Sequence, residues 1–378
     1  MTDKKYFCYE IYKNLAIWSH NGHLAYNPCS FFNGFIKESD SFDLDGIWNG
    51  PERAELKRCV ETDTPISGCK SCYDAEEHGF MSRRKSSQIL YEKYFHDTNI
   101  DLDAPQGLDY SVGNLCNLKC VVCGPHNSTA WISDYRTLYP LRPIDQFKYK
   151  KFNQLETFDS GLLKNIKSLH IHGGGEPLMS NNHINLLKEI KKVKGLSDIR
   201  LFYNTNATLL ASPELLELWK ECQLIELYFS IDDIGDRFNY QRTGANWNTV
   251  TDNLKWYIEN MPHNHMFTIN CTWSYLNLYY LPELVDWYQA NLFTNRYGDP
   301  VNLIFQRVVG NFNILHLSDT VKNILVKRFS NYSQLTALVN SINTSDKNHQ
   351  LFWNEIEKID RVRKTNYKNL CPEWSQLL

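Results

Sequence analysis

The sequence predicts an α/β fold built around a parallel sheet. Between residues 108 and 316, strand-like apolar runs alternate with segments of helical periodicity, so that six β–α units follow one another. Parallel strands need helical crossovers with short, right-handed connections, and this alternation supplies them. Six units are fewer than the eight of a closed barrel. The predicted strands are Asp109–Gly113, Ser168–His172, Ile199–Asn204, Leu224–Ile231, His265–Trp273 and Val301–Val309.

Helices are expected between these strands and after the last one. Those in the sheet region are Ser180–Lys192, Pro213–Cys222, Trp247–Asn260 and Leu281–Ala290. The pattern then stays helical, with Thr320–Arg328, Ser333–Ile342 and Trp353–Arg363. We therefore expect three parts: a cysteine-rich segment over residues 1–107, the sheet region over 108–316 and a helical C-terminal region over 317–378.

The segment before the sheet combines a hairpin with a set of cysteines. Asn14–Trp18 and His23–Tyr26 are strand-like, and Asn21-Gly22 between them is typical of a tight hairpin turn. Four thiols make a complete metal-ligand set, which either a zinc ion or an iron–sulfur cluster accepts. These four are Cys8, Cys29, Cys69 and Cys72. The run Arg83-Arg84-Lys85 could grip an acidic substrate, although short basic runs more often form a solvated helix face.

The overall composition argues against several classes of protein. The 378 residues carry a formal net charge of −3, so we expect no general affinity for nucleic acids or membranes. The sequence contains no apolar run that would span a bilayer, and its start lacks the core of a signal peptide. Its 11 cysteines form an odd count without a secretion signal, which favours metal or redox chemistry in a reducing cytoplasm over disulfides.

Two motifs follow the first two predicted strands. Cys116, Cys120 and Cys123 have the spacing C-x3-C-x2-C. Iron–sulfur clusters usually take four protein thiolates, so a loop with three leaves one iron without a protein ligand. A structural zinc site prefers four ligands and fits this triplet poorly. Gly173–Pro177, with the sequence Gly-Gly-Gly-Glu-Pro, follows the second strand. Both motifs therefore fall at the carboxyl ends of strands, where ligands bind in parallel sheets.

This pair of motifs resembles the radical S-adenosylmethionine (SAM) enzymes. The resemblance implies a partial (β/α)6 TIM-like barrel and a [4Fe–4S] cluster on the three cysteines. SAM would then chelate the fourth iron through its amino and carboxylate groups. Gly174, Gly175 and Glu176 would orient SAM by hydrogen bonding to its amino group.

Further residues at the predicted strand ends match the pattern of this family. Asn206 follows the third strand in a motif where Ala207 replaces the usual glycine, and Ser230 and Asp232 end the fourth strand. The resemblance implies that Asn206 contacts SAM and that Ser230 and Asp232 meet the SAM ribose. It also implies that Arg242 binds the SAM carboxylate, for which a guanidinium has suitable geometry. The alternative for Asn206 and Asp232 is a helix-cap or turn role, which these residue types favour.

The four N-terminal cysteines resemble the twitch domain, the shortened form of the SPASM domain that carries an auxiliary cluster in many radical SAM enzymes. In this chain the set precedes the barrel, whereas twitch domains usually follow it. The resemblance implies a second, auxiliary [4Fe–4S] cluster, and zinc stays open as the alternative.

The resemblance also implies the reaction. An electron from the reduced cluster would cleave SAM to methionine and a 5′-deoxyadenosyl radical, which abstracts hydrogen from a substrate. We expect a peptide or peptide-bound residue that undergoes epimerisation, cross-linking or oxidation, because SPASM and twitch enzymes often modify ribosomal peptides. The alternatives are a small molecule, such as an amino acid, a sugar or an aminocyclitol, and a non-enzymatic metal scaffold. A flavodoxin or ferredoxin would be the reductant. Cys271 is either a hydrogen-atom donor to a substrate radical or a small buried hydrophobe.

Overall fold

The computed structural model of the protein divides the chain into two compact units. The first contains Met1–Asn114, Asp145–Tyr203 and Ser212–Ile225, and the second contains Leu115–Ile144, Asn204–Ala211 and Glu226–Leu378. The described residues are 4–20, 23–39, 43–77, 79, 81–96, 99, 102, 104–147, 160–172, 174–291, 294–308, 312, 314, 316–340, 342–344 and 350–378.

The first unit holds strands in the order β3-β2-β1-β4-β5-β6. Their bounds are β1 Asn14–His20, β2 His23–Asn27, β3 Lys37–Ser39, β4 Gly107–Ser111, β5 Ser168–His172 and β6 Arg200–Thr205. β1 and β2 pair antiparallel, which confirms the predicted hairpin strands, although the turn residues 21 and 22 lie outside the described residues. β1 also pairs in parallel with β4, with Ala16 opposite Asp109. The N-terminal hairpin therefore extends the sheet.

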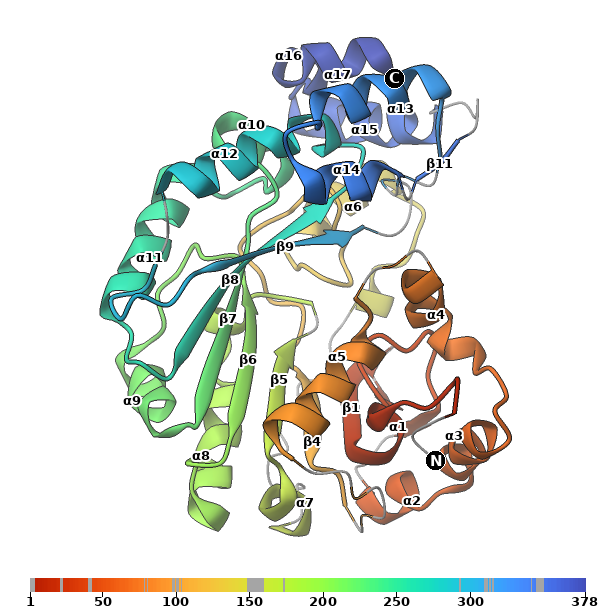
Figure 1. The fold of residues 1–378 in the computed structure, drawn as a ribbon, viewed down its shortest axis with the longest axis vertical. Helices are drawn as coiled ribbons and strands as arrows, with labels where there is room; N and C mark the ends of the chain where they lie inside the picture. Colours follow the sequence, from red (N-terminus) through yellow and green to blue (C-terminus); the bar gives the residue numbers. More distant parts are fainter. Residues whose placement is uncertain are drawn as a thin grey trace. The chain divides into compact units, whose positions relative to one another are not determined.

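Helices surround the strands of this unit. They are α1 Tyr9–Lys13, α2 Leu44–Trp48, α3 Pro51–Glu61, α4 Lys70–Glu77, α5 Arg83–Ile89, α7 Ser160–Asn165, α8 Asn182–Lys194 and α9 Pro213–Glu221. Figure 1 shows α1, α3 and α5 gathered beside β1. A buried core joins them, with Tyr9 and Ile11 of α1, Val60 of α3 and Tyr91 in contact. Since fully burying a large apolar side chain contributes about 1.5–3 kcal/mol, this core fixes α1 and the residue before it, Cys8.

The second unit begins with α6 and ends with a group of C-terminal helices (Figure 1). Its strands β8 and β9 pair in parallel, with Cys271 opposite Phe305, and β7 enters it from the first unit. The bounds are α6 Trp131–Leu138, β7 Leu224–Ser230, α10 Gly235–Gln241, α11 Trp247–Asn260, β8 His265–Trp273, α12 Leu281–Asn291, β9 Asn302–Arg307, β10 His316–Leu317, α13 Asp319–Arg328, α14 Ser333–Asn340, β11 Asn343–Thr344, α15 Gln350–Arg363, α16 Tyr367–Leu370 and α17 Pro372–Leu377.

The predicted α/β class with a parallel sheet is confirmed, and the fold is consistent with a partial TIM barrel. The predictions for Ser168–His172 and His265–Trp273 match both ends of β5 and β8. The three-part domain division stays a prediction. Among the described residues, no helix is both long enough and apolar enough to cross a bilayer.

A buried histidine makes the stability of the first unit depend on pH. His183 of α8 has no exposed surface, and neither ring nitrogen has a hydrogen-bond partner among the described residues. Its ring packs edge-on against Tyr203, with 5.3 Å between ring centroids. Burial lowers the pKa of His183 to about 3. The histidine binds a proton more readily in the unfolded chain than in the folded one. The contribution of neutral, buried His183 to the free energy of unfolding is therefore complete above the ordinary histidine pKa and is lost as the pH falls towards 3.

We predict that His183→Leu weakens this pH dependence. Between pH 7 and pH 5 the lowered pKa of His183 accounts for about 2 kcal/mol of lost stability, which the variant should not lose. Urea unfolding followed by circular dichroism at both pH values measures the difference. His263→Leu, at an exposed position, is the control. An undiminished pH dependence in His183→Leu would contradict this assignment.

Candidate functional site

The three-cysteine loop lies in the second unit and is held by two neighbouring segments. The amide of Lys119 donates to the carbonyl of Thr243 at 2.9 Å, and the amide of Val121 donates to the carbonyl of Gln241 at 2.7 Å. From α6, the indole nitrogen of Trp131 donates to the carbonyl of Cys120 at 2.7 Å. The backbone of the loop is therefore fixed by α6 and by residues 240–244, which are the last two residues of α10 and the turn after α10.

Gly244 allows this turn to approach the loop closely. Its φ is +104°, a left-handed conformation that favours glycine, and a Cβ there would lie 3.2 Å from the carbonyl oxygen of Asn117. It would also lie 3.3 Å from a methyl carbon of Leu118. A larger residue would force the turn and the loop apart.

The three thiols share one electrostatic environment. A hydrogen bond between the two thiols lowers the pKa of Cys120 to about 7 and raises the pKa of Cys123. The guanidinium of Arg242 acts to lower both pKa values, and the Cys116 thiol adds to the rise at Cys123. The Cys116 sulfur accepts from the amide of Leu118 at 3.4 Å. Cys120 and Cys123 therefore lie in hydrogen-bond contact, and Arg242 and Cys116 are near enough to act on them electrostatically. Among the described residues these three thiols do not form a group compact enough to hold a single metal ion, so the ligand set stays a prediction.

Arg242 is positioned by a carboxylate. Its Nη2 and Nε lie 2.8 and 2.9 Å from Oδ2 of Asp232, and Oδ1 of Asp232 accepts from the amide of Thr272 at 2.8 Å. Both carboxylate oxygens of Asp232 are thus engaged, and the side chain is buried. Although burial acts against it, Asp232 raises the pKa of Arg242, so the guanidinium stays charged. Arg242 and Asp232 were both predicted as SAM contacts from the sequence, but nothing in the sequence predicted their ion pair.

Asn206 contacts the cysteine loop through its amide group. Its Nδ2 lies 3.0 Å from Oδ1 of Asn117 and 3.8 Å from the sulfur of Cys116. Its Oδ1 accepts from the amide of Thr208 at 3.0 Å, which is the turn role weighed for this residue type. Ala207 has a φ of +57°, the left-handed conformation for which a glycine is better suited. A SAM contact by Asn206 stays a prediction.

Cys271 and Ser230 lie on the two strands β8 and β7. Cys271 has no exposed surface, and its thiol donates to the carbonyl of Asp232 at 3.5 Å. Its sulfur lies 3.8 Å from Nδ2 of Asn277, and burial raises its pKa. This environment is that of a packed small side chain, and its role as a hydrogen donor stays a prediction. Ser230 is the last residue of β7 and is partly buried.

The glycine motif lies in the first unit, directly after β5. Gly173 falls outside the described residues. Gly175 has a φ of +89°, so the turn requires glycine there. Glu176 is 2% exposed, and its Oε1 accepts from the amide of Leu178 at 3.2 Å, which caps a short 3-10 helix. Orientation of SAM by Gly174, Gly175 and Glu176 stays a prediction.

The four N-terminal cysteines lie in the first unit, where Cys8, Cys29 and Cys72 are buried and Cys69 is partly buried, and their thiols influence one another. Burial raises the pKa of Cys8, with smaller contributions from Glu10, Cys69 and Cys72, and Cys8 in turn adds to the raised pKa of Cys29. The sulfur of Cys8 accepts from the amide of Glu10. The sulfur of Cys72 accepts from the amides that begin α5. Among the described residues, no three histidine, cysteine or acidic side chains lie close enough to hold a single metal ion.

The expectation that the basic run forms a solvated helix face is wrong for Arg83 and Arg84. Arg83 Nε lies 2.9 Å from Oε1 of Glu10, and its Nη2 lies 3.0 Å from Oδ1 of Asp109. Arg84 Nε donates to Oε1 of Glu76 at 3.0 Å. Both guanidinium groups are mostly buried, because carboxylates distant in the sequence face them. The local periodicity of a sequence cannot predict which carboxylates will pair with these arginines.

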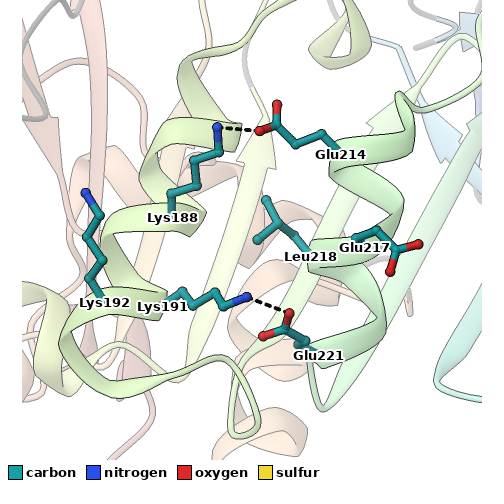
Figure 2. A pocket seen from close by; sticks show the side chains of 7 residues that line it. All are labelled: Lys188, Lys191, Lys192, Glu214, Glu217, Leu218 and Glu221. Atoms are coloured by element: carbon teal, nitrogen blue, oxygen red, sulfur yellow. Dashed lines mark hydrogen bonds and ion pairs between the residues drawn. The ribbon is translucent and has the colours of Figure 1, made fainter.

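An exposed groove between α8 and α9 in the first unit lies among charged side chains (Figure 2). Lys188 pairs with Glu214 at 2.5 Å, and Lys191 pairs with Glu221 at 2.7 Å. Leu218 lies between the two pairs. None of the predicted site residues lines this groove, and its charged side chains are paired either across the two helices or within one of them.

Comparison with known proteins places the central part of the chain in a family. Residues 110–275 match the family model of the Radical SAM superfamily. The chain is 28% identical over 149 residues to GTP 3′,8-cyclase of Limosilactobacillus fermentum, covering 38% of this chain and 39% of that protein. It is 28% identical over 132 residues to GTP 3′,8-cyclase of Petrotoga mobilis, covering 34% and 36%. The chain therefore spans about two fifths of these curated relatives.

The solved structures to which this chain is similar include two that are bound to SAM. Native anSMEcpe with bound AdoMet superposes with a TM-score of 0.43 at 16% identity, over 63% of each chain. Streptococcus suis SuiB bound to S-adenosylmethionine superposes with a TM-score of 0.37 at 15% identity, over 89% of this chain and 71% of that one. On the strength of the family-model match, residues 110–275 form a domain of the Radical SAM superfamily, which indicates that the chain is an enzyme.

Proposed function

We propose that this chain is a radical SAM enzyme whose [4Fe–4S] cluster is held by Cys116, Cys120 and Cys123. The observation that carries the proposal is the contact between the Cys120 and Cys123 thiols, with the guanidinium of Arg242 and the Cys116 thiol near enough to act on them electrostatically, within the superfamily domain. When bound, the cluster and SAM supply reductive cleavage of SAM to methionine and a 5′-deoxyadenosyl radical that abstracts hydrogen from a substrate.

The residues present fit an anionic cluster. Thiolates are the ligands that iron–sulfur clusters require, and the guanidinium of Arg242 favours them because it acts to lower the pKa of both Cys120 and Cys123. Arg242 offsets part of the negative charge. The amide of Leu118 and the side chain of Asn206 donate towards the sulfur of Cys116. Such N–H donors stabilise thiolate ligands and tune the cluster that they hold.

Arg242 is assigned to the carboxylate of SAM. Asp232 engages Nε and Nη2, which form one edge of the guanidinium, and the Nη1 side is assigned to the ligand. Asp232 would then position Arg242, in addition to the ribose contact that the family pattern implies for it and for Ser230. Asn206 would contact SAM from the end of β6. Gly174, Gly175 and Glu176 would orient the amino group of SAM.

The four N-terminal cysteines are assigned to an auxiliary [4Fe–4S] cluster. Their support is mutual electrostatic influence, burial and backbone N–H donors to the sulfurs of Cys8 and Cys72. Burial raises the pKa of the Cys29 thiol, and the Arg83 guanidinium acts against this rise. A zinc ion accepts four thiolates as well, so iron content decides between the two metals.

The substrate that we favour is a peptide or a peptide-bound residue. Its support is the twitch-like set of four cysteines, since enzymes with such sets often modify ribosomal peptides. A small-molecule substrate is the second candidate, and it is favoured by the relatives named GTP 3′,8-cyclase. Either substrate requires an electron donor, for which a flavodoxin or ferredoxin is suited. The proposed donor role of Cys271 would apply to a peptide epimerase.

We predict that anaerobic reconstitution with iron and sulfide loads about eight irons per chain, four at each cluster. Cys120→Ala should lose about four irons and all SAM cleavage, measured as 5′-deoxyadenosine. Cys72→Ala should lose the other irons and leave the SAM-binding cluster loaded. Cys222→Ala is the control, because this thiol is buried, donates to the carbonyl of Leu218 and belongs to neither predicted ligand set. Persistent cleavage of SAM in Cys120→Ala would contradict the assignment of Cys120 as a cluster ligand. Zinc at the N-terminal site would contradict the assignment of an auxiliary iron–sulfur cluster there.

Arg242→Lys should raise the KM for SAM about tenfold, because an ammonium cannot bind a carboxylate through two parallel hydrogen bonds. The measurement is the rate of 5′-deoxyadenosine formation against SAM concentration. Arg296→Lys, at an exposed position, should leave the KM unchanged. A wild-type KM in Arg242→Lys, with iron content intact, would show that Arg242 does not bind SAM.

A further inference from the structure

One face of α15 reaches the turn that carries Arg242. Asp360 and Arg363 are three residues apart, so they project from the same side of this helix. Oδ1 of Asp360 accepts from the hydroxyl of Tyr240 at 3.0 Å, and Nη1 of Arg363 donates to Oγ1 of Thr243 at 3.0 Å. All of these residues belong to the second unit. A C-terminal helix therefore holds the turn on both sides of Arg242.

Arg363 also contacts the helix that supports the cysteine loop. Its Nε lies 2.8 Å from Oδ2 of Asp134, and Oδ1 of Asp134 lies 2.8 Å from Nζ of Lys119. The guanidinium carbon of Arg363 lies 4.5 Å from the centre of the Trp131 ring, which donates to the carbonyl of Cys120. Arg363 thus contacts both supports of the loop, which are α6 and the turn after α10.

Burial makes this arrangement rigid. The side chains of Arg363 and Asp134 are 3% and 6% exposed. A buried ion pair adds little net stability, but removing one partner leaves an uncompensated charge, so shifted arrangements of the loop are disfavoured. The planar guanidinium can bind a carboxylate, bind a hydroxyl and stack on an indole at once, which an ammonium cannot do. The ion pair between Arg363 and Asp134 therefore fixes the position of the cysteine loop relative to the turn after α10.

We propose that Arg363 is a positioning residue of the SAM-cleaving site, acting through Asp134, Trp131 and Thr243 to hold Cys120 and Arg242 in register. This inference rests on the proposed function. It makes α15 a component of the cluster site, although the helix lies more than 200 residues beyond the cysteine loop in the sequence.

The test compares Arg363→Gln, Arg363→Lys and the control Arg361→Gln, which alters an exposed arginine of the same helix. In reconstituted full-length chain, Arg363→Gln should keep its iron but lower kcat/KM for SAM cleavage about tenfold or more. It should also weaken the change that SAM causes in the electron paramagnetic resonance spectrum of the reduced cluster. Arg363→Lys should recover part of the loss, and Arg361→Gln should match wild type.

Two further variants separate positioning from general stability. Ile359→Val trims a buried residue of α15 and should lower the melting temperature while keeping wild-type cleavage. Thr243→Val removes the hydroxyl that accepts from Arg363 and donates to the carbonyl of Tyr240 at 2.7 Å. It should lower cleavage, which keeps the test informative should Arg363→Gln fail to fold. Equal loss of cleavage in Ile359→Val, or wild-type cleavage and spectra in Arg363→Gln, would overturn the proposal.

The same experiment distinguishes this failure from failure of the proposed function. If the wild-type chain cleaves SAM and Cys120→Ala does not, wild-type behaviour of Arg363→Gln refutes only the role of Arg363. If wild type itself forms no 5′-deoxyadenosine, the proposed function fails, and the role of Arg363 fails with it.

Discussion

As cluster ligands, the three thiols of one short loop would concentrate negative charge, and the proposed site depends on how that charge is offset. Arg242 supplies the cation, and Asp232 holds it in place with both carboxylate oxygens engaged. Burial of such groups would be costly without these pairings, because an isolated charge is poorly solvated inside a protein. The turn that carries Arg242 therefore has to be fixed as firmly as the loop itself.

The fold meets this requirement with residues that are remote from one another in the sequence. The backbone of the loop bonds directly to the turn after α10, and the close approach of the two segments depends on Gly244. Trp131 of α6 donates a hydrogen bond to the carbonyl of Cys120 in the loop. Arg363 of α15 contacts both α6 and the turn after α10. In the first unit a similar principle applies, since the buried carboxylates of Glu10 and Asp109 are matched by Arg83 near the N-terminal cysteines.

Much of the fold could be predicted because periodicity is a local signal. β5 and β8 begin and end where the alternation of the sequence indicates. The three-cysteine loop follows β4, and the glycine motif follows β5, as predicted. The pairing of β1 with β4 could not be predicted in this way, because it joins segments about 90 residues apart. The residue types at the candidate site were recognisable from their motifs. The partners of Arg242 and Arg83 were not, since a salt bridge between distant segments leaves no trace in composition or spacing.

The central claim is that the three-cysteine loop leaves one iron open and that SAM occupies it. Electron–nuclear double resonance on the reduced, reconstituted chain with SAM labelled at its amino nitrogen and carboxylate oxygens tests this claim most directly. The account predicts hyperfine coupling from both labels, with a strength that requires direct bonds to the cluster. A [4Fe–4S] signal with bound SAM but no coupling from either label would contradict it.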